Sequence, residues 1–134
     1  MRLAFVLAAL SLLAAAPVAA QEIPAAFVGS WKGTGSQSDE PGEWTIALTL
    51  ADGPRGGVVG TITYPSLDCG GDLILRVADR GRVELAERIT FGDCVDHGIV
   101  TLTPASAGLA FDWRTDGGGP VARGALSHAL PPKN

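Results

Sequence analysis

Histidine and cysteine are scarce in this sequence, and with them the side chains that most often carry out nucleophilic and acid–base chemistry. The chain has two histidines and two cysteines among its 134 residues, and it contains no Gly-x-Ser-x-Gly motif. His128 lies close to the C-terminus, and no nucleophile can be named beside His97. The alternative to a non-catalytic protein is an enzyme in which His97 acts as an acid or base together with Asp93 or Asp96. We expect that the protein is not an enzyme.

Long apolar runs are also few, and the run at the N-terminus is too short to cross a membrane as a helix. It covers residues 3–13, whereas a spanning helix needs about 20 residues. Val18 and Ala20 are small residues at the third and the first position before Gln21, where signal peptidase requires small side chains. We therefore predict a signal peptide over residues 1–20, with an uncleaved membrane anchor as the alternative.

Basic residues are fewer than acidic ones. Lys and Arg together number 10 and Asp and Glu 14, which gives a formal net charge of −4 at pH 7. This negative charge argues against nucleic acid and anionic lipid as partners. Once residues 1–20 are removed, we expect a periplasmic or secreted monomer without membrane contact. It should have one domain at residues 21–128 and a disordered tail at residues 129–134.

Glycine, in contrast, is abundant, and all 18 glycines follow residue 20. They separate short β-prone runs, and no window has a helical period long enough to compete. The runs cover residues 27–37, 43–51, 57–64, 72–78, 82–91, 97–103, 108–114 and 120–127. This spacing predicts an all-β protein, a small antiparallel up-and-down barrel of about eight strands or a sandwich, of which we favour the barrel.

Apolar and polar residues alternate within these runs, as in strands that bury one face. A sheet with one buried face can wrap onto itself and so remove its edge strands. The expected interior positions are Trp44, Ile46, Leu48, Leu50, Leu73, Leu75, Val77, Leu109, Phe111 and Trp113.

Glu87 breaks this pattern, because a carboxylate falls on an otherwise apolar face. That face carries Val83, Leu85, Ile89 and Phe91. A carboxylate inside a barrel must be paired, solvated by a cavity or protonated. Glu87 could be the polar anchor of a ligand, or it could pair with an inward Arg123, or a bulge could turn it outward. The tryptophans could line the same cavity or fill the core. The candidate ligand-binding residues are Glu87, Trp31, Trp44, Trp113 and Arg123.

Cys69 and Cys94 are expected to form a disulfide, since cysteines in exported proteins are usually paired. A metal site is the alternative, but it would need more Cys or His than His97. Acidic residues surround the two cysteines without matching a known calcium loop, and turn-forming Asp beside Gly explains most of them. These residues are Asp68, Asp72, Asp93 and Asp96. We expect no metal and no cofactor.

The first run contains Gly29-Ser30-Trp31, a Gly-x-Trp motif that resembles the start of the calycins, which include lipocalins, fatty-acid-binding proteins and avidins. The resemblance implies an up-and-down barrel in which Trp31 plugs one end. In lipocalins an Arg near the last strand often covers this Trp, and Arg123 is the candidate here. The biotin ligands of avidins have no counterparts in this sequence.

A longer resemblance covers residues 31–126. Tyr-Pro-Ser-Leu-Asp-Cys at residues 64–69 and Glu-Arg-Ile-Thr-Phe-Gly-Asp-Cys at residues 87–94 resemble the extracytoplasmic β-domains of some bacterial serine/threonine kinases and their secreted relatives. The resemblance implies a shared fold, a Cys69–Cys94 disulfide and a sensing or binding role. The kinase part is absent, so no catalytic residue is carried over.

The expected function is therefore that of an exported, non-catalytic β-barrel module that binds a small molecule or acts as a sensor. Its partner would be an unidentified small molecule or another exported protein. The alternative is a structural or inhibitory protein-interaction module whose barrel is closed and packed. An eight-stranded barrel can be filled by its own side chains or can hold one small ligand, so the size of its interior separates the two.

Overall fold

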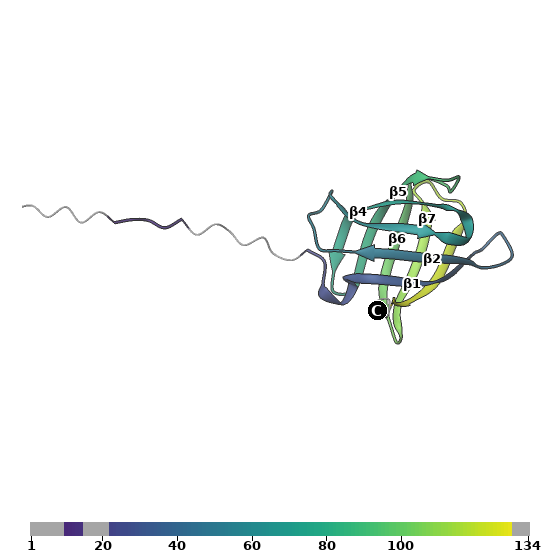
Figure 1. Ribbon diagram of the computed structural model, residues 1–134, viewed down its shortest axis with the longest axis horizontal. Coiled ribbons are helices and arrows are strands. Elements are labelled where there is room, and N and C mark those ends of the chain that lie inside the picture. The colour runs from purple at the N-terminus through teal and green to yellow at the C-terminus, as the bar shows by residue number, and fades with distance from the viewer. Residues whose placement is uncertain (1–9, 15–21, 130–134) are drawn as a thin grey trace, which may run out of the picture.

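The computed structural model describes residues 10–14 and 22–129, and within these ranges it is an all-β protein with one closed barrel of eight antiparallel strands (Figure 1). The predicted fold class is confirmed. The predicted cleavage site and residues 130–134 of the predicted tail lie outside the described residues. Ala129, the first residue of that predicted tail, still donates its backbone N–H to the carbonyl of Ser30, at 2.8 Å.

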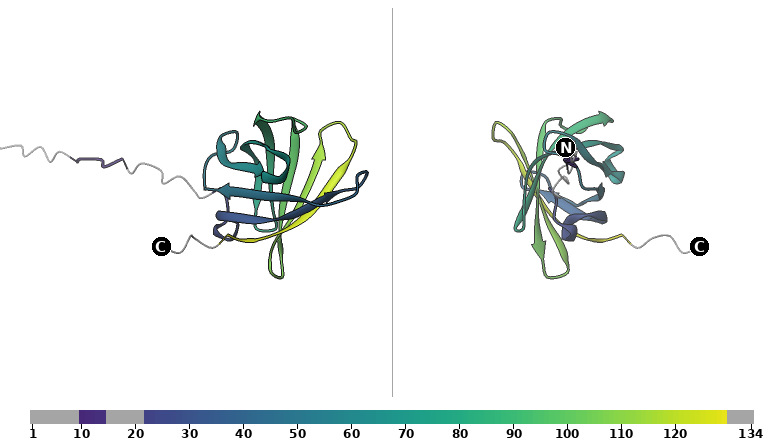
Figure 2. Two further views of the ribbon diagram at one scale, coloured as in Figure 1. Left: turned by 45° about the vertical axis from the view of Figure 1, so that its right-hand side comes forward. Right: turned by 90° about the vertical axis from the view of Figure 1, so that its left-hand side faces the viewer.

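Each strand pairs with the next one in the chain, and the last pairs with the first, as the two views of Figure 2 show. Two short 3-10 turns accompany the strands. The strands are β1 (Gly29–Gln37), β2 (Trp44–Leu50), β3 (Val58–Tyr64), β4 (Cys69–Asp79), β5 (Arg82–Phe91), β6 (Gly98–Ala105), β7 (Gly108–Thr115) and β8 (Val121–His128), and the turns are η1 (Ala25–Phe27) and η2 (Pro65–Leu67). These bounds agree with the predicted runs to within two residues, except that β4 begins at Cys69 rather than at residue 72.

The interior is apolar, as the alternation predicted. The buried positions of β2, β4 and β7 include Ile46, Leu48, Leu50, Leu73, Leu75, Leu109, Phe111 and Trp113. Strands of a small barrel must also cross closely. A Cβ at Gly33 in β1 would overlap the carbonyl of Ala125 in β8, so glycine permits the contact between the two strands that closes the barrel.

Two predicted interior residues are exceptions, and a β-bulge explains each. The pairing of β4 with β5 shifts between Leu75 and Val77, which places Val77 opposite the outward Glu84 and turns Ala78 toward the core. A second shift lies near the end of β5, where Phe91 pairs with Gly70 and is 50% exposed. A bulge adds one residue to one strand and therefore reverses which face the following residues occupy.

One end of the barrel is filled by the segment that precedes β1. Ile23 and Phe27 are fully buried, and the indole N–H of Trp31 donates to the carbonyl of Phe27 at 2.9 Å. The ring of His128 stacks on Trp31 with 3.8 Å between ring centroids. His128, and not Arg123 as the calycin resemblance implied, therefore covers this tryptophan. The carboxylate of Asp52 accepts the N–H of Ile23 at 2.9 Å and anchors the segment.

Candidate functional site

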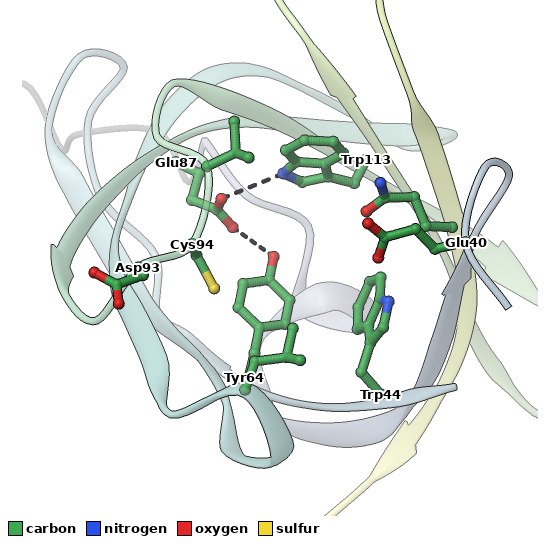
Figure 3. A pocket seen from close by; sticks show the side chains of 10 residues that line it. Glu40, Trp44, Tyr64, Glu87, Asp93, Cys94 and Trp113 are labelled. Atoms are coloured by element: carbon green, nitrogen blue, oxygen red, sulfur yellow. Dashed lines mark hydrogen bonds between the residues drawn. The ribbon is translucent and has the colours of Figure 1, made fainter. Parts of the chain in front are cut away.

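The opposite end of the barrel is hollow. A cavity of about 340 Å³ opens there, where the odd-numbered strands end and the even-numbered strands begin (Figure 3). We call it the mouth pocket. Its lining residues are Gln37, Glu40, Trp44, Tyr64, Leu67, Glu87, Asp93, Cys94, Val95 and Trp113. The barrel is thus packed around Trp31 at one end and open at the other.

Glu87 faces the interior and is 2% exposed, as its position in the strand predicted. The hydroxyl of Tyr64 donates a hydrogen bond to Oε2 at 2.5 Å, and the indole N–H of Trp113 donates to Oε1 at 3.2 Å (Figure 3). Each carboxyl oxygen therefore has one donor, which satisfies the requirement that a buried polar group be hydrogen-bonded. Two neutral aromatic donors hold the carboxyl, and no cation does so among the contacts of the described residues.

The predicted pairing of Glu87 with Arg123 is wrong. Ala122 and Leu126 are the buried residues of β8, so Arg123 lies on the outer face. Its Nε lies 3.3 Å from Oδ1 of Asp112 on β7, and 83% of its side chain is exposed. The register of β8 decided this orientation. Leu126 occupies the interior, and Arg123 is three positions away in the strand, so its side chain lies on the opposite face.

Gly98 makes room for the contact between Glu87 and Trp113. A Cβ at Gly98, the first residue of β6, would overlap the indole nitrogen of Trp113 and would lie 3.1 Å from Oε1 of Glu87. Neither Gly98 nor Tyr64 was among the site residues predicted from the sequence. Tyr64 carried a signal that could have been used, because it follows the inward Ile62 by two residues in the same strand.

Burial raises the pKa of Glu87, and the negative charge of Asp96 adds to this effect, while the hydrogen bonds from Tyr64 and Trp113 act in the opposite direction. Burial is the largest cause, so the Glu87 carboxyl is protonated more readily than a glutamate in water. Burial and the neighbouring Glu87 also raise the pKa of Tyr64 well above its ordinary value. The Tyr64 hydroxyl therefore keeps its proton at neutral pH and remains a donor.

Aromatic rings form the walls beside this carboxyl. The ring of Trp44 meets that of Tyr64 almost at a right angle, with 5.4 Å between centroids and 85° between planes. It meets Phe111 in the same way, at 6.3 Å and 80°. Trp44 is half-buried, so part of its ring faces the mouth pocket.

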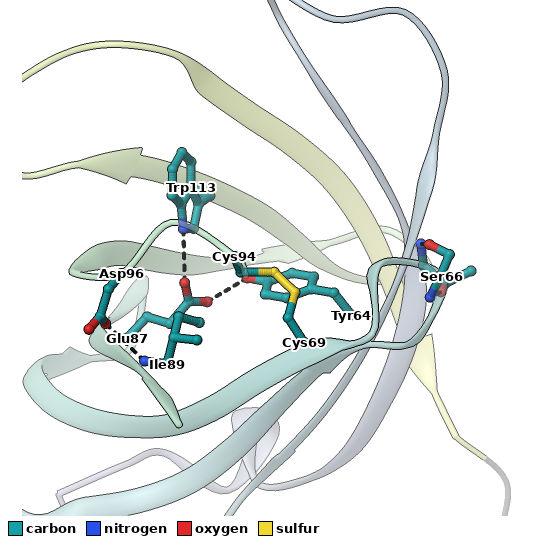
Figure 4. Close-up of a disulfide and its surroundings, with 9 residues drawn as sticks. Tyr64, Ser66, Cys69, Glu87, Ile89, Cys94, Asp96 and Trp113 are labelled. Carbon is teal, nitrogen blue, oxygen red and sulfur yellow. Dashed lines mark hydrogen bonds between the residues drawn. A yellow bond between two sulfur atoms is a disulfide. The ribbon is translucent and has the colours of Figure 1, made fainter. Parts of the chain in front are cut away.

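The disulfide between Cys69 and Cys94 is present, as predicted, and it fixes the loop that forms one wall of the pocket (Figure 4). This wall loop covers residues 92–97 and contributes Asp93, Cys94 and Val95 to the lining. Oδ1 of Asp96 accepts the N–H of Ile89 at 2.9 Å, which returns the loop to β5.

The acidic residues near the disulfide have separate contacts. Asp72 pairs with Arg88 at 2.7 Å, and Asp96 accepts two backbone N–H groups, which lower its pKa. Asp93 lies at the rim of the mouth pocket. In the part of the chain that the structure describes, no three His, Cys, Asp or Glu side chains are grouped so that they could hold a metal ion.

The structure brings together three of the five candidate ligand-binding residues, namely Glu87, Trp44 and Trp113. Trp31 lies at the packed end of the barrel, and Arg123 lies on its outer surface.

No helix among the described residues has the length and hydrophobicity needed to cross a membrane. Comparison of the chain with family models, with curated proteins and with solved structures gave no match.

Proposed function

We propose that this protein is an exported, non-catalytic β-barrel that binds a small molecule in the mouth pocket. The observation that carries the proposal is the pairing of a cavity of about 340 Å³ with a buried carboxyl group that lines it. Small-molecule sites are concave, mostly apolar and provided with a few oriented polar groups, and their volumes begin at about 300 Å³. Glu87 is such a polar group, and the aromatic side chains supply the apolar area.

The preformed geometry of Glu87 also supports binding. Tyr64 and Trp113 each donate to one oxygen, which fixes the plane of the carboxyl group. Each oxygen of a carboxylate can accept about two hydrogen bonds, so capacity remains for a ligand. A group that is oriented before the ligand arrives loses little conformational freedom on binding.

The lining residues favour binding over catalysis. Among these described residues Tyr64 carries the only hydroxyl, and its raised pKa makes the phenolate form rare. The sulfur of Cys94 is held in the disulfide and is not a free thiol. The pocket thus offers shape and hydrogen bonds but no activated nucleophile on the residues that line it.

Export is supported by two independent features. Residues 1–20 have the composition of a cleavable signal, and the Cys69–Cys94 bridge belongs to oxidising compartments. We place the mature protein in the periplasm or outside the cell. The resemblance to the extracytoplasmic β-domains of some bacterial kinases would imply the same location and a sensing or binding role.

The test is a fragment screen by ligand-observed NMR on residues 21–134, with two variants that are matched in size and exposure. Val95 lines the mouth pocket and is 59% exposed, whereas Val58 lies outside the lining and is 55% exposed. We expect Val95→Trp to obstruct the pocket and to weaken bound fragments at least about tenfold, which is about 1.4 kcal/mol of binding free energy. Val58→Trp should leave them unchanged. The proposal would be overturned if the fragments bound Val95→Trp as tightly as the wild type, or if no fragment bound at all.

A protein-interaction module is the second candidate, because apolar side chains are exposed around the mouth. Leu67 and Val95 belong to the lining and Phe91 lies at the same end of the barrel, and each is at least half exposed. Exposed apolar groups that gather in one place often mark interaction surfaces. Under this alternative the fragment screen gives no ligand.

A further inference from the structure

We propose that the ligand of the mouth pocket is a small organic cation, held by its ammonium or guanidinium group between carboxylates and aromatic rings. This inference rests on the proposed small-molecule function and names the class of ligand. It is carried by the charge of the lining residues, by the arrangement of the rings and by the positions of two carboxyl groups, one buried and one at the rim.

The first observation is charge. Of the ten described residues that line the pocket, three are acidic and none is Lys, Arg or His. The acidic ones are Glu40, Glu87 and Asp93. A net charge of −4 on the whole chain adds to the negative potential there. An anionic ligand would be repelled, and a neutral apolar ligand would remove water from carboxylates without replacing it.

Four arginines of the barrel, by contrast, form ion pairs on its outer surface. Arg88 contacts Asp72, and Arg123 contacts Asp112. Arg76 and Arg114 share Glu84 as their partner. Oε1 of Glu84 lies 3.6 Å from Nε of Arg76 and 3.9 Å from a terminal guanidinium nitrogen of Arg114. These ion pairs hold the four arginines on the outer face, away from the acidic pocket. The lining acids therefore lack a charged partner within the lining, and a bound cation would provide one.

The second observation is the aromatic wall. Trp44, Tyr64 and Trp113 surround the opening, and Figure 3 shows them arranged around one common space. The rings of Trp44 and Tyr64 stand at 85° to each other. Cations are attracted to the faces of aromatic rings, to tryptophan most strongly, and several rings at steep angles form the cages that recognise alkylated ammonium groups.

The third observation is the position of the carboxyl groups. Glu87 and Glu40 approach the pocket from opposite sides, with the aromatic rings between them (Figure 3). Glu87 is buried, and each of its carboxyl oxygens accepts one hydrogen bond, from Tyr64 or from Trp113. Each oxygen keeps a further lone pair that can accept an N–H group of the ligand or contact its positive charge. Glu40 is exposed at the rim, where it can attract a cation toward the opening.

The experiment compares choline with its neutral carbon isostere, in which a tert-butyl group replaces the trimethylammonium group, by calorimetry on residues 21–134. Agmatine, which carries a guanidinium group and a primary ammonium group, extends the test to guanidinium ligands. The isostere has the same shape, so the comparison isolates charge. We expect at least one of the two cations to bind at least about tenfold more tightly than the neutral isostere, the ratio that corresponds to about 1.4 kcal/mol.

Matched variants connect the charge effect to this pocket. Glu87→Gln keeps the size of the side chain and removes its charge, and it should weaken cation binding about tenfold or more. Glu40→Gln should weaken it about threefold, because the rim is exposed. Glu43→Gln is the control, since Glu43 is exposed on the same β1–β2 connection but does not line the pocket, and cation binding should not change. Glu40→Gln also serves if Glu87→Gln fails to fold.

The outcomes separate this inference from the function on which it rests. If the neutral isostere or other fragments bind in the pocket as tightly as both cations, the small-molecule function stands and the cation inference is wrong. Equal losses in Glu40→Gln and Glu43→Gln would place cation binding outside the pocket and would also overturn it. If neither choline nor agmatine binds, the cation inference is likewise wrong, and the fragment screen decides the function independently.

Discussion

At the scale of single residues, the site consists of one acid and the groups that hold it. Glu87 is buried among apolar side chains, and its two oxygens accept hydrogen bonds from Tyr64 and Trp113. These donors stabilise the ionised form, while burial destabilises it by more. The carboxyl group is therefore sensitive both to pH and to small changes in its neighbours, and two predictions test this arrangement.

The first prediction concerns the pH dependence of folding. Glu87 has an ordinary pKa of 4.5, and burial raises it in the folded protein. The folded protein then binds this proton more tightly than the unfolded chain does. The contribution of Glu87 to stability is greatest below pH 4.5 and declines as pH rises through the raised pKa. The free energy of unfolding should be measured by urea melts from below pH 4.5 to above the raised pKa. It should fall with rising pH in the wild type, and Glu87→Gln should lack this fall.

Asp96, whose pKa is lowered, contributes the opposite slope at lower pH, but it does so in both proteins and therefore largely cancels in their difference. Tyr64→Phe provides a further control. It removes a donor to the ionised carboxyl group, so the pKa of Glu87 should rise further and the decline should move to higher pH. A wild type and a Glu87→Gln variant with parallel stability curves would show that the pKa of Glu87 is not raised.

The second prediction concerns Gly98, where a methyl group would occupy the space of the Trp113 ring. We expect Gly98→Ala to lower the free energy of unfolding by about 1–3 kcal/mol, the usual cost of overpacking. Trp113 fluorescence should change as its hydrogen bond to Glu87 is lost. Gly117→Ala is the control, since a methyl group at Gly117 meets nothing within 4 Å. Equal effects of the two substitutions in urea melts would mean that Gly98 has no special role.

At the scale of elements, the disulfide connects the start of β4 to the wall loop between β5 and β6. Strand pairing alone does not hold residues 92–97, because β5 ends at Phe91 and β6 begins at Gly98. The loop relies on the bridge and on the hydrogen bond from Ile89 to Asp96. The shape of the mouth pocket therefore depends on the oxidised state of the two cysteines.

We predict that reduction lowers the free energy of unfolding by about 2–5 kcal/mol, as is usual for a disulfide in a small exported domain. Hydrogen exchange should become faster in the wall loop before it does in the strands, because the loop loses its main constraint. The double variant Cys69→Ala/Cys94→Ala should behave like the reduced wild type and should not respond to reductant. A reductant effect of the same size on that variant would show that the bridge is not the cause.

At the scale of the whole molecule, the barrel has two different ends. One end is filled by Ile23, Phe27 and Trp31, and the other contains the mouth pocket. Packing at the first end supplies stability, because buried apolar area is removed from water there. The other end can then remain open without exposing the core.

This division of roles gives a prediction for two phenylalanines that differ in burial. Phe27 is fully buried at the packed end, whereas Phe91 is half exposed at the open end. We expect Phe27→Ala to lower the free energy of unfolding by about 3–5 kcal/mol, the cost of a large cavity in a core. Phe91→Ala should cost much less. Equal losses in thermal or urea melts would mean that η1 and its neighbours do not belong to the core.

The sequence by itself determined the all-β class, the number of strands, the two faces of most strands and the inward position of Glu87. Alternation in a strand is a local property with a period of two residues, so it can be recognised without knowledge of the partner strand. The disulfide could be predicted because the chain has two cysteines and the features of an exported protein.

Only the tertiary structure decided the partners of Glu87, the outward positions of Val77 and Phe91, and the open state of one barrel end. Tyr64 and Trp113 are separated from Glu87 by 23 and 26 residues, and they meet it only through the register of the closed barrel. Each bulge between β4 and β5 reverses the faces that follow it, and the sequence carries no clear mark of where a bulge lies. Whether an interior is filled depends on how residues from all strands pack together, which no single strand determines.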